Sequence, residues 1–596
     1  MLPLHPLRLL LGQPPGVVCY RCGRPPESHR GQARSCRPIL GATRHCAKGE
    51  RYLPTFGLHN DREDILPLHP LGPTTSSPHT FKLANLWLDK CLNNHSECTS
   101  RFTPGDRLPT RLIEIRTHDP KRPKSARLRW GATLPTGTTY VTLSHCWGVE
   151  RFLTLTTQNE AHMMNEVPLD ALAIKFRDAI EITSGLGFGY LWIDSLCILQ
   201  DSPEDWGAES ARMAQVFEHS ALTIAATCSP SASFGCFAKR PAHSDSCLLP
   251  EGASSILDGK ASWLTTQKKE DAFWLENVES HSLPLQMRGW TLQERLLSPR
   301  ILYFSNDGIF WECNKVCASE IWHSHNRTPK QWISLLKIPP TISKKMTISW
   351  HELWITLLVD YSQRLLSYPD RDKLVAVSGI AKAFQNLLRE RYFAGLWEGD
   401  MLRALCWQKS YSPDTSPMSP EALLYRAPSW SWASVDGKLE FDLRWYKSPK
   451  ELRYLAEIKH VEADLATEDP MGQLKGGSIK LMGFPMHLLV YPNSAIPADT
   501  CNGWLKCVWD KRFQNITWDR EPTRVTYPRN LWCLPIVHRS LPNSGTLNHI
   551  FCLLLEPADP ESETPNKFYR VGLLAQSNFL SKYQWELEDS REITII

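Results

Sequence analysis

The feature that most constrains the fold is an alternation of strand-like and helix-like segments between residues 138 and 304. Apolar and β-branched residues predict strands, and apolar residues at helical spacing predict helices. The predicted strands are 138–148, 188–200, 221–227 and 300–304, and the predicted helices are 168–187, 201–220 and 291–297. Strands that alternate with helices form a parallel sheet covered on both faces. We therefore predict an α/β domain over residues 138–310, interrupted by a polar insertion at 228–286.

The rest of the chain divides into four further regions, because 596 residues are too many for one hydrophobic core. Residues 1–75 are rich in Pro, Arg, Gly and His and lack a helical or strand period, so we predict a disordered extension. We predict a helical flank at 76–137, a mainly α-helical region at 311–450 and a β-rich C-terminal region at 451–596.

Charge and cysteine usage bear on partners and location. The net charge of +4 is too small to indicate a nucleic-acid partner. No apolar run reaches the roughly 18 residues that a spanning helix needs, and prolines interrupt the apolar N-terminus. The 18 cysteines are spread along the chain without a compact repeat, which is typical of reduced thiols. We expect a cytoplasmic protein with no membrane or nucleic-acid partner.

Two groups of cysteines raise the question of a metal site. The first group, Cys19, Cys22, Cys36 and Cys46, has a spacing that fits no common zinc module. The second consists of Cys91, His95 and Cys98, which share one helix face at i, i+4 and i+7. Three ligands could hold a metal only with a fourth from elsewhere. We favour the simpler interpretation, in which small residues pack this helix onto the next domain, and predict no metal site.

Polar residues gather where the predicted strands end. Ser144 and His145 end the first strand, and Asp194 and Ser195 interrupt the second. Open α/β sheets bind ligands beyond the C-terminal ends of their strands. The helix that carries Glu294 is expected to begin at the same edge. Polar side chains from separate segments therefore predict a site there.

Each of these residues also has a structural interpretation. His145 is either a hydrogen-bonded core histidine or a base, and Asp194 is either the buried anchor of a polar network or part of the site. Thr291 followed three residues later by Glu294 fits a capping box, which would account for the carboxylate without catalysis. The sequence leaves these alternatives open.

Three motifs in order carry a family resemblance: "YVTLSHCWG", "LWIDSLCILQDSPEDWGAESARMAQVF" and "RGWTLQERLLSPRILYF". They resemble the HET (heterokaryon incompatibility) domain of filamentous fungi over about residues 138–310. Weaker family-typical flanks are "WLDKCLNNHSEC" before them, and "YSQRLLS" and "APSWSWASVDG" after them. The resemblance implies a role in allorecognition or defence, in which activation of the domain triggers cell death.

The HET domain in turn is similar to Toll/interleukin-receptor (TIR) domains, some of which cleave NAD through a glutamate. This resemblance implies a flavodoxin-like parallel sheet with flanking helices, and Glu294 matches the glutamate. Glu294, with Asp194 and His145, is the implied catalytic group, because a carboxylate stabilises an oxocarbenium-like charge. The implied nucleotide-binding residues are Ser144, Trp147, Ser195, Arg288 and Trp290.

The leading hypothesis is a HET-domain cell-death effector that takes NAD as substrate and holds no resident cofactor. Its expected partners are a second copy of the chain or other proteins of the incompatibility system. One alternative is a non-enzymatic signalling module that works by self-association. Another is a degenerate paralogue of such proteins.

Overall fold

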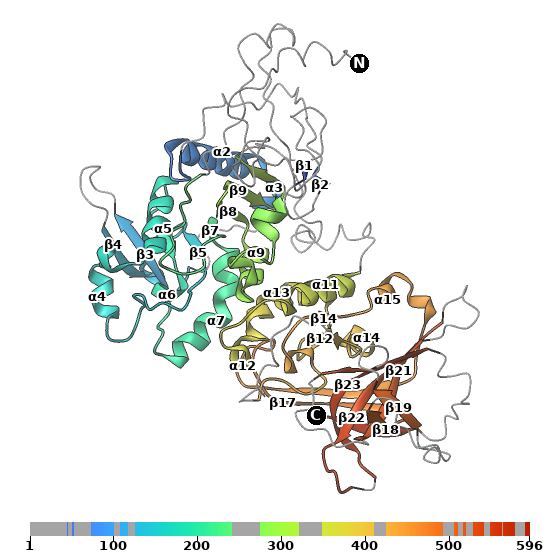
Figure 1. The fold of residues 1–596 in the computed structure, drawn as a ribbon. Coiled ribbons are helices and arrows are strands. Elements are labelled where there is room, and N and C mark those ends of the chain that lie inside the picture. The colour runs from blue at the N-terminus through green and yellow to red at the C-terminus, as the bar shows by residue number, and fades with distance from the viewer. Residues whose placement is uncertain are drawn as a thin grey trace, which may run out of the picture.

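The structure is a computed structural model, and it places most of the chain outside residues 1–75. It describes residues 44–45, 51–52, 73–99, 108–116, 125–240, 274–320, 349–410, 425–492, 506–510, 516–519, 529–540, 549–562, 564–577 and 590–596. In the predicted disordered extension, β1 (Arg44–His45) pairs with β2 (Arg51–Tyr52), and most other positions lie outside the described residues. Figure 1 shows two sheets in separate parts of the molecule, with helices between them.

The first sheet has eight strands in the order β10-β9-β8-β7-β5-β6-β3-β4. Their bounds are β3 (Arg111–Arg116), β4 (Ser125–Trp130), β5 (Val141–Ser144), β6 (Tyr190–Trp192), β7 (Leu222–Ala226), β8 (Arg300–Ser305), β9 (Gly308–Cys313) and β10 (Cys317–Ser319). Neighbours within β6-β5-β7-β8 are parallel, and the pairs toward both edges are antiparallel. In chain order these four strands run 2-1-3-4, as in doubly wound sheets of the flavodoxin type. The predicted α/β class is confirmed, with a mixed sheet.

Helices cover this sheet and bury its apolar residues. They are α2 (Pro78–Asn94), α3 (Ser96–Thr99), α4 (Glu160–Asn165), α5 (Ile174–Gly185), α6 (Asp194–Cys197), α7 (Pro203–Glu218) and α9 (Trp290–Leu297). Alternate residues of β8 point to opposite faces. Leu302 and Phe304 join the larger core with α2, α5 and α7, whereas Ile301 and Tyr303 join a smaller cluster on the other face. The start of α7 is as predicted, because Ser202 Oγ accepts a hydrogen bond from Asp205 N at 3.2 Å.

The second predicted strand is shorter than expected. The prediction of a strand over 188–200 is wrong beyond Trp192, because Asp194 begins the single turn of α6. The Asp194 carboxylate accepts from Ser195 N at 2.7 Å, and such a local bond competes with strand pairing. Asp194 and Ser195 therefore follow the strand instead of interrupting it.

The sheet extends past both predicted limits, residues 138 and 310. The predicted helical flank starts with α2 and α3, but β3 and β4 then add two strands to the sheet. Arg111 of β3 is buried and pairs with Asp205 at 3.0 Å and Glu160 at 2.7 Å. These contacts with α7 and α4 make the flank part of the same folded unit.

The second unit combines helices with a ten-stranded sheet. Its helices are α11 (Trp350–Ser362), α12 (Pro369–Asp372), α13 (Val375–Leu388), α14 (Met401–Ala404) and α15 (Arg444–Lys447). Its sheet contains β15 (Leu452–Tyr454), β16 (Glu457–Leu465), β17 (Leu474–Gly483), β18 (Met486–Pro492), β19 (Lys506–Asp510), β20 (Ile516–Trp518), β21 (Arg529–Arg539), β22 (His549–Pro557), β23 (Lys567–Ser577) and β24 (Arg591–Ile595). The second unit also contains two small antiparallel sheets of two strands each. One pairs β11 (Tyr392–Phe393) with β12 (Leu396–Trp397), and the other pairs β13 (Gln408–Lys409) with β14 (Leu439–Glu440).

The segment "APSWSWASVDG" is not the half-buried strand that its alternation predicts. It forms a turn followed by a 3-10 helix over Trp432–Ser434, and Trp430 and Trp432 are both fully buried. The Trp432 indole N–H donates to the carbonyl of Gly395 at 3.1 Å, and Ser431 Oγ donates to Ala394 O at 2.5 Å. Hydrogen bonds across the core therefore decide this conformation, not a strand period.

Helix α9 is shared between the two units. Its Leu292 and Leu296 belong to the core of the second unit, although the helix leads into β8 of the first sheet. Gln293 Oε1 accepts a hydrogen bond from Gly379 N of α13 at 2.8 Å. The orientation of α9 therefore depends on both units.

Replacing Gly379 by Ala is expected to destabilise the protein by about 1–3 kcal/mol, the usual cost of overpacking. The added Cβ would lie 2.4 Å from Ala214 Cβ and 2.6 Å from Gln293 Oε1. The matched control is Gly207→Ala in α7, where no atom apart from the neighbouring residues and the backbone of the helix itself lies within 4 Å of the added Cβ. Urea unfolding should show a loss for Gly379→Ala and a gain of about 0.5–1 kcal/mol for the control. Equal effects would contradict the close α13–α7 packing.

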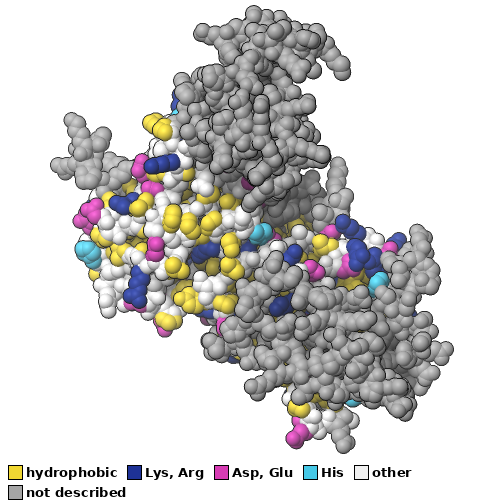
Figure 2. Space-filling model, in the orientation of Figure 1, with side chains coloured by type: hydrophobic (Ala, Val, Ile, Leu, Met, Phe, Trp, Pro, Cys, Tyr) yellow, Lys and Arg dark blue, Asp and Glu magenta, His cyan; other side chains and the backbone are white. Residues whose placement is uncertain are grey.

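Figure 2 shows basic, acidic and hydrophobic side chains interspersed over the part of the molecule that holds the first sheet. Among the described residues, no helix combines the length and the apolar character needed to cross a bilayer.

Candidate functional site

Ser144 and Glu294 meet at the C-terminal end of β5. Ser144 is the last residue of that strand, and Glu294 lies within α9. The Ser144 hydroxyl donates a short hydrogen bond to Glu294 Oε2. Both residues are only 4% exposed. Two segments 150 residues apart thus bring a carboxyl group to the edge where open α/β sheets bind ligands.

The capping-box interpretation of Glu294 is wrong. Helix α9 begins at Trp290, its N-cap is Gly289, and no side chain caps it. Thr291 lies inside the helix, and its hydroxyl donates to Leu285 O at 2.9 Å and Arg288 O at 2.8 Å. The chain turns into the helix two residues earlier than a Thr291 cap requires. Glu294 is therefore in the helix interior, with its carboxylate turned to Ser144.

Asp194 is the centre of a second set of hydrogen bonds. Its carboxylate accepts from His145 Nε2 at 2.9 Å, Trp147 Nε1 at 2.8 Å and Ser195 N at 2.7 Å. Burial alone would raise the pKa of Asp194, but His145, Arg288 and the Trp147 N–H outweigh it and lower the pKa. A carboxylate with three donors stays ionised and fixes its neighbours. This geometry fits the first interpretation of Asp194, that of a buried residue that anchors a polar network.

His145 is held in one orientation. Its ring is buried and packs edge-on against Phe176, with ring centroids 5.2 Å apart. Burial lowers the pKa of His145, even though the nearby Asp194 carboxylate acts in the opposite direction. The Arg288 guanidinium donates to the His145 carbonyl and so ties the loop before α9 to the end of β5.

Glu294 has the electrostatics of a group that exchanges a proton near neutral pH. Burial raises its pKa to about 7, and Asp194 adds to the rise. The guanidinium groups of Arg288 and Arg364 and the Ser144 hydroxyl act in the opposite direction. Asp194 and Glu294 therefore form a pair of carboxyl groups with opposite pKa shifts. Such pairs divide the roles of charged group and proton carrier in many active sites.

Two basic residues join the site without having been predicted. Arg364 follows α11, and its guanidinium donates to Thr291 Oγ1 at 3.1 Å and to Asp360 Oδ2 at 2.8 Å. Lys175 of α5 is fully buried and donates to Cys146 O at 2.9 Å. Burial lowers the pKa of Lys175 to about 8. Arg364 lies in the flank motif "YSQRLLS", and Lys175 directly precedes Phe176 within the helix predicted over residues 168–187.

Several neighbours of Glu294 in sequence point away from it. Trp290 Nε1 donates to Asp372 Oδ2 at 3.2 Å, and Arg295 pairs with Glu312 at 3.0 Å. Arg295 follows Glu294 directly, so the helix turns its side chain to another direction. Trp290 lies one turn before Glu294 on the same helix, but its indole N–H is bound to Asp372. Ser195, in contrast, lies beside Asp194, and its buried hydroxyl has no hydrogen-bond partner among the described residues.

A comparison with protein families assigns part of the chain to a known family. Residues 140–294 match the family model described as "Heterokaryon incompatibility protein (HET)". The chain carries a HET domain. The match contains all eight candidate residues, from Ser144 to Glu294. No curated protein and no solved structure matches the chain significantly.

The HET domain indicates a function of the heterokaryon incompatibility type. The folded unit is larger than the match, because β3 and β4 precede it and β8, β9 and β10 follow it in the same sheet. The match ends at Glu294, within the helix that also packs against the second unit.

Raising the pH from about 5 to about 8 is expected to lower the free energy of unfolding of the HET domain by up to about 3 kcal/mol through Glu294. Its pKa rises from 4.5 to about 7 on folding, so the native state binds the proton more tightly. The stabilisation is complete below pH 4.5 and is lost as the pH rises through about 7. Urea unfolding of the wild type and Glu294→Gln at both pH values would measure it. A difference between the two proteins that does not change with pH would contradict the shift.

Proposed function

We propose that the HET domain cleaves the N-glycosidic bond of NAD in the cytoplasm and that this activity triggers the cell death of heterokaryon incompatibility. The observation that carries the proposal is the buried Glu294 carboxyl group, which contacts Ser144 and has a pKa of about 7. A group with this pKa supplies a carboxylate at neutral pH in surroundings where its charge has a strong effect.

The chemistry requires charge stabilisation more than acid catalysis. The bond between ribose C1 and the nicotinamide nitrogen breaks, and its electron pair leaves with nicotinamide. The ribose is left with oxocarbenium character, which a nearby carboxylate stabilises. Water then adds to C1 and releases one proton, giving ADP-ribose. In this scheme the Glu294 carboxylate faces the ribose, and the Ser144 hydroxyl holds it in place.

The other residues of the site have supporting roles in the proposal. Arg288 is half-buried, and a guanidinium group is suited to the pyrophosphate oxygens. Trp147 offers an aromatic face to the nucleotide while its N–H is held by Asp194 at 2.8 Å. Asp194 acts as a positioning residue, because its carboxylate already accepts three hydrogen bonds.

The position in the sheet supports this assignment. Ser144 ends β5, the strand between β6 and β7 at which the chain order reverses. In doubly wound sheets this reversal opens the crevice that binds nucleotides. Glu294 and Asp194 approach the same strand end from α9 and α6.

A second candidate function is non-enzymatic self-association. Ser144, His145 and Glu294 are nearly fully buried, as expected of structural groups. Exposed apolar side chains lie close by: Val149 is fully exposed and Phe234 is 57% exposed. Their loops touch, because Ala232 N donates to Trp147 O at 3.3 Å. Such side chains are suited to contact with a second copy of the chain or another protein of the incompatibility system.

Incubation of the full chain with NAD would decide between the two candidates. The proposal predicts release of nicotinamide and ADP-ribose in equal amounts, measured by chromatography. Light scattering on the same samples would report self-association. Absence of release from folded, self-associated protein would contradict NAD cleavage and favour the second candidate.

A further inference from the structure

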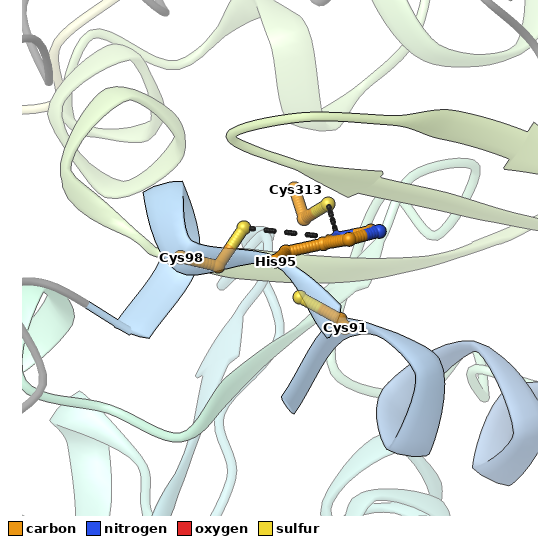
Figure 3. A group of neighbouring side chains, drawn as sticks. All are labelled: Cys91, His95, Cys98 and Cys313. Carbon is orange, nitrogen blue, oxygen red and sulfur yellow. Dashed lines mark hydrogen bonds between the residues drawn. The ribbon is translucent and has the colours of Figure 1, made fainter. Parts of the chain in front are cut away.

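Four potential metal ligands converge away from the Glu294 site. Cys91 lies in the last turn of α2, His95 is the C-cap of that helix, Cys98 lies in α3, and Cys313 ends β9. Figure 3 shows the three residues of the helical segment turned toward Cys313 on the facing strand. The ligand atoms of all four lie within 4.8 Å of one another.

The spacing of these atoms suits a tetrahedral ion. His95 Nδ1 lies 3.4 Å from Cys313 Sγ and 4.0 Å from Cys98 Sγ. A tetrahedral zinc centre with ordinary bond lengths separates nitrogen and sulfur by about 3.6 Å. Three sulfurs and one imidazole are one of the common ligand sets of structural zinc. They also disfavour Mg²⁺ and Ca²⁺, which prefer oxygen.

A buried arginine supplies the second, independent observation. Arg300 is fully buried, and its Nε lies 3.2 Å from Cys91 Sγ. Its remaining hydrogen bonds go to the carbonyls of Ala221 and Cys98, and among the described residues no carboxylate forms an ion pair with it. A buried guanidinium without a counter-charge is costly. Zn²⁺ with three thiolates carries one negative charge, which Arg300 would neutralise.

We propose that Cys91, His95, Cys98 and Cys313 bind one structural Zn²⁺ ion. The four protein ligands close the coordination shell, so the ion stabilises the fold and activates no water. It would clamp the α2–α3 segment to β9, linking residues 218 positions apart. The proposed zinc site would give Cys91, His95 and Cys98 a role beyond the one expected from the sequence, which was to pack their helix onto the next domain. The site is independent of the proposed NAD cleavage.

The zinc content of the purified full chain tests the proposal. Mass spectrometry of the metal should find about one zinc per chain in the wild type and a near-complete loss in Cys313→Ser. The matched control is Cys317→Ser, because Cys317 lies on the same hairpin, is equally buried at 2% and is outside the cluster. Cys317→Ser should keep its zinc. Wild-type protein that is folded, prepared with zinc and yet metal-free would overturn the proposal.

Cobalt substitution covers the case in which Cys313→Ser fails to fold. Zinc-stripped wild type loaded with Co²⁺ should show thiolate-to-cobalt charge transfer and the visible bands of tetrahedral cobalt. His95→Cys should keep these bands in shifted form, because a fourth thiolate can replace the imidazole. A six-coordinate spectrum, or a disulfide found between two of the cysteines, would refute the site. Neither readout depends on enzymatic activity.

Discussion

Replacing Glu294 by Gln is expected to lower the rate of nicotinamide release from NAD by a factor on the order of 10²–10³. Gln keeps the shape of Glu294 and can still contact Ser144, but it carries no charge to stabilise the ribosyl cation. Because the carboxyl group is buried with a pKa raised to about 7, the variant should be at least as stable as the wild type at neutral pH. Loss of release with retained stability would identify a catalytic role.

The matched control is Glu209→Gln in α7. Glu209 is also a buried carboxyl group whose pKa is raised by burial, but it accepts a hydrogen bond from Thr110 at 2.6 Å and pairs with Arg212 at 3.7 Å, and not with the site residues. Glu209→Gln should leave nicotinamide release nearly unchanged. Equal losses in both variants, or release that survives in Glu294→Gln, would move the chemistry away from Glu294.

Replacing Arg295 by Met is expected to destabilise the protein by about 3–5 kcal/mol. The Arg295 guanidinium pairs with Glu312 at 3.0 Å and with Glu279 at 3.1 Å, and all three side chains are less than 10% exposed. The Tyr303 hydroxyl donates to Glu312 as well. Removal of the arginine takes this cation away from both buried carboxyl groups, whereas Met preserves most of the packing volume. Thermal and urea unfolding would measure the loss.

The ion pair between Lys315 and Glu97 is more exposed and serves as the control for Arg295→Met; Lys315 lies in the loop between β9 and β10. Lys315 lies 3.5 Å from Glu97, and both side chains are close to half exposed. Lys315→Met should cost less than about 1 kcal/mol. If Arg295→Met costs no more than Lys315→Met, the buried network does not hold α9 against β9.

Local sequence patterns predicted the α/β unit because the spacing of apolar residues and the capping residues that define each helix or strand lie within that element or next to it. The apolar runs of β5, β7 and β8 predicted strands without any information on tertiary contacts. Ser202 and Pro203 predicted the start of α7, because capping depends on residues next to one another. Ser144 and Glu294 were expected at the same edge because parallel strands place their C-terminal ends along one edge of the sheet.

Contacts between distant segments limited the remaining predictions. The capping box predicted at Thr291 was wrong because α9 begins earlier, with Gly289 as its N-cap. Gly289 N donates a hydrogen bond to Leu365 O, a contact with a distant segment that the sequence does not show. Cys313, the fourth ligand of the proposed zinc site, follows His95 by 218 positions, so no spacing rule connects them. Trp432 lies in a 3-10 helix and not in the predicted strand, and its indole N–H donates to Gly395 O, an acceptor that belongs to another segment.

The pH dependence of nicotinamide release tests the central claim most directly. If the ionised Glu294 carboxylate stabilises the reacting ribose, release by the wild type should rise with pH and reach half its maximum near the pKa of about 7. Glu294→Gln should show no such rise. A wild-type profile with its midpoint near 4.5, the ordinary value for a glutamate, or a rise that persists in Glu294→Gln, would contradict the account.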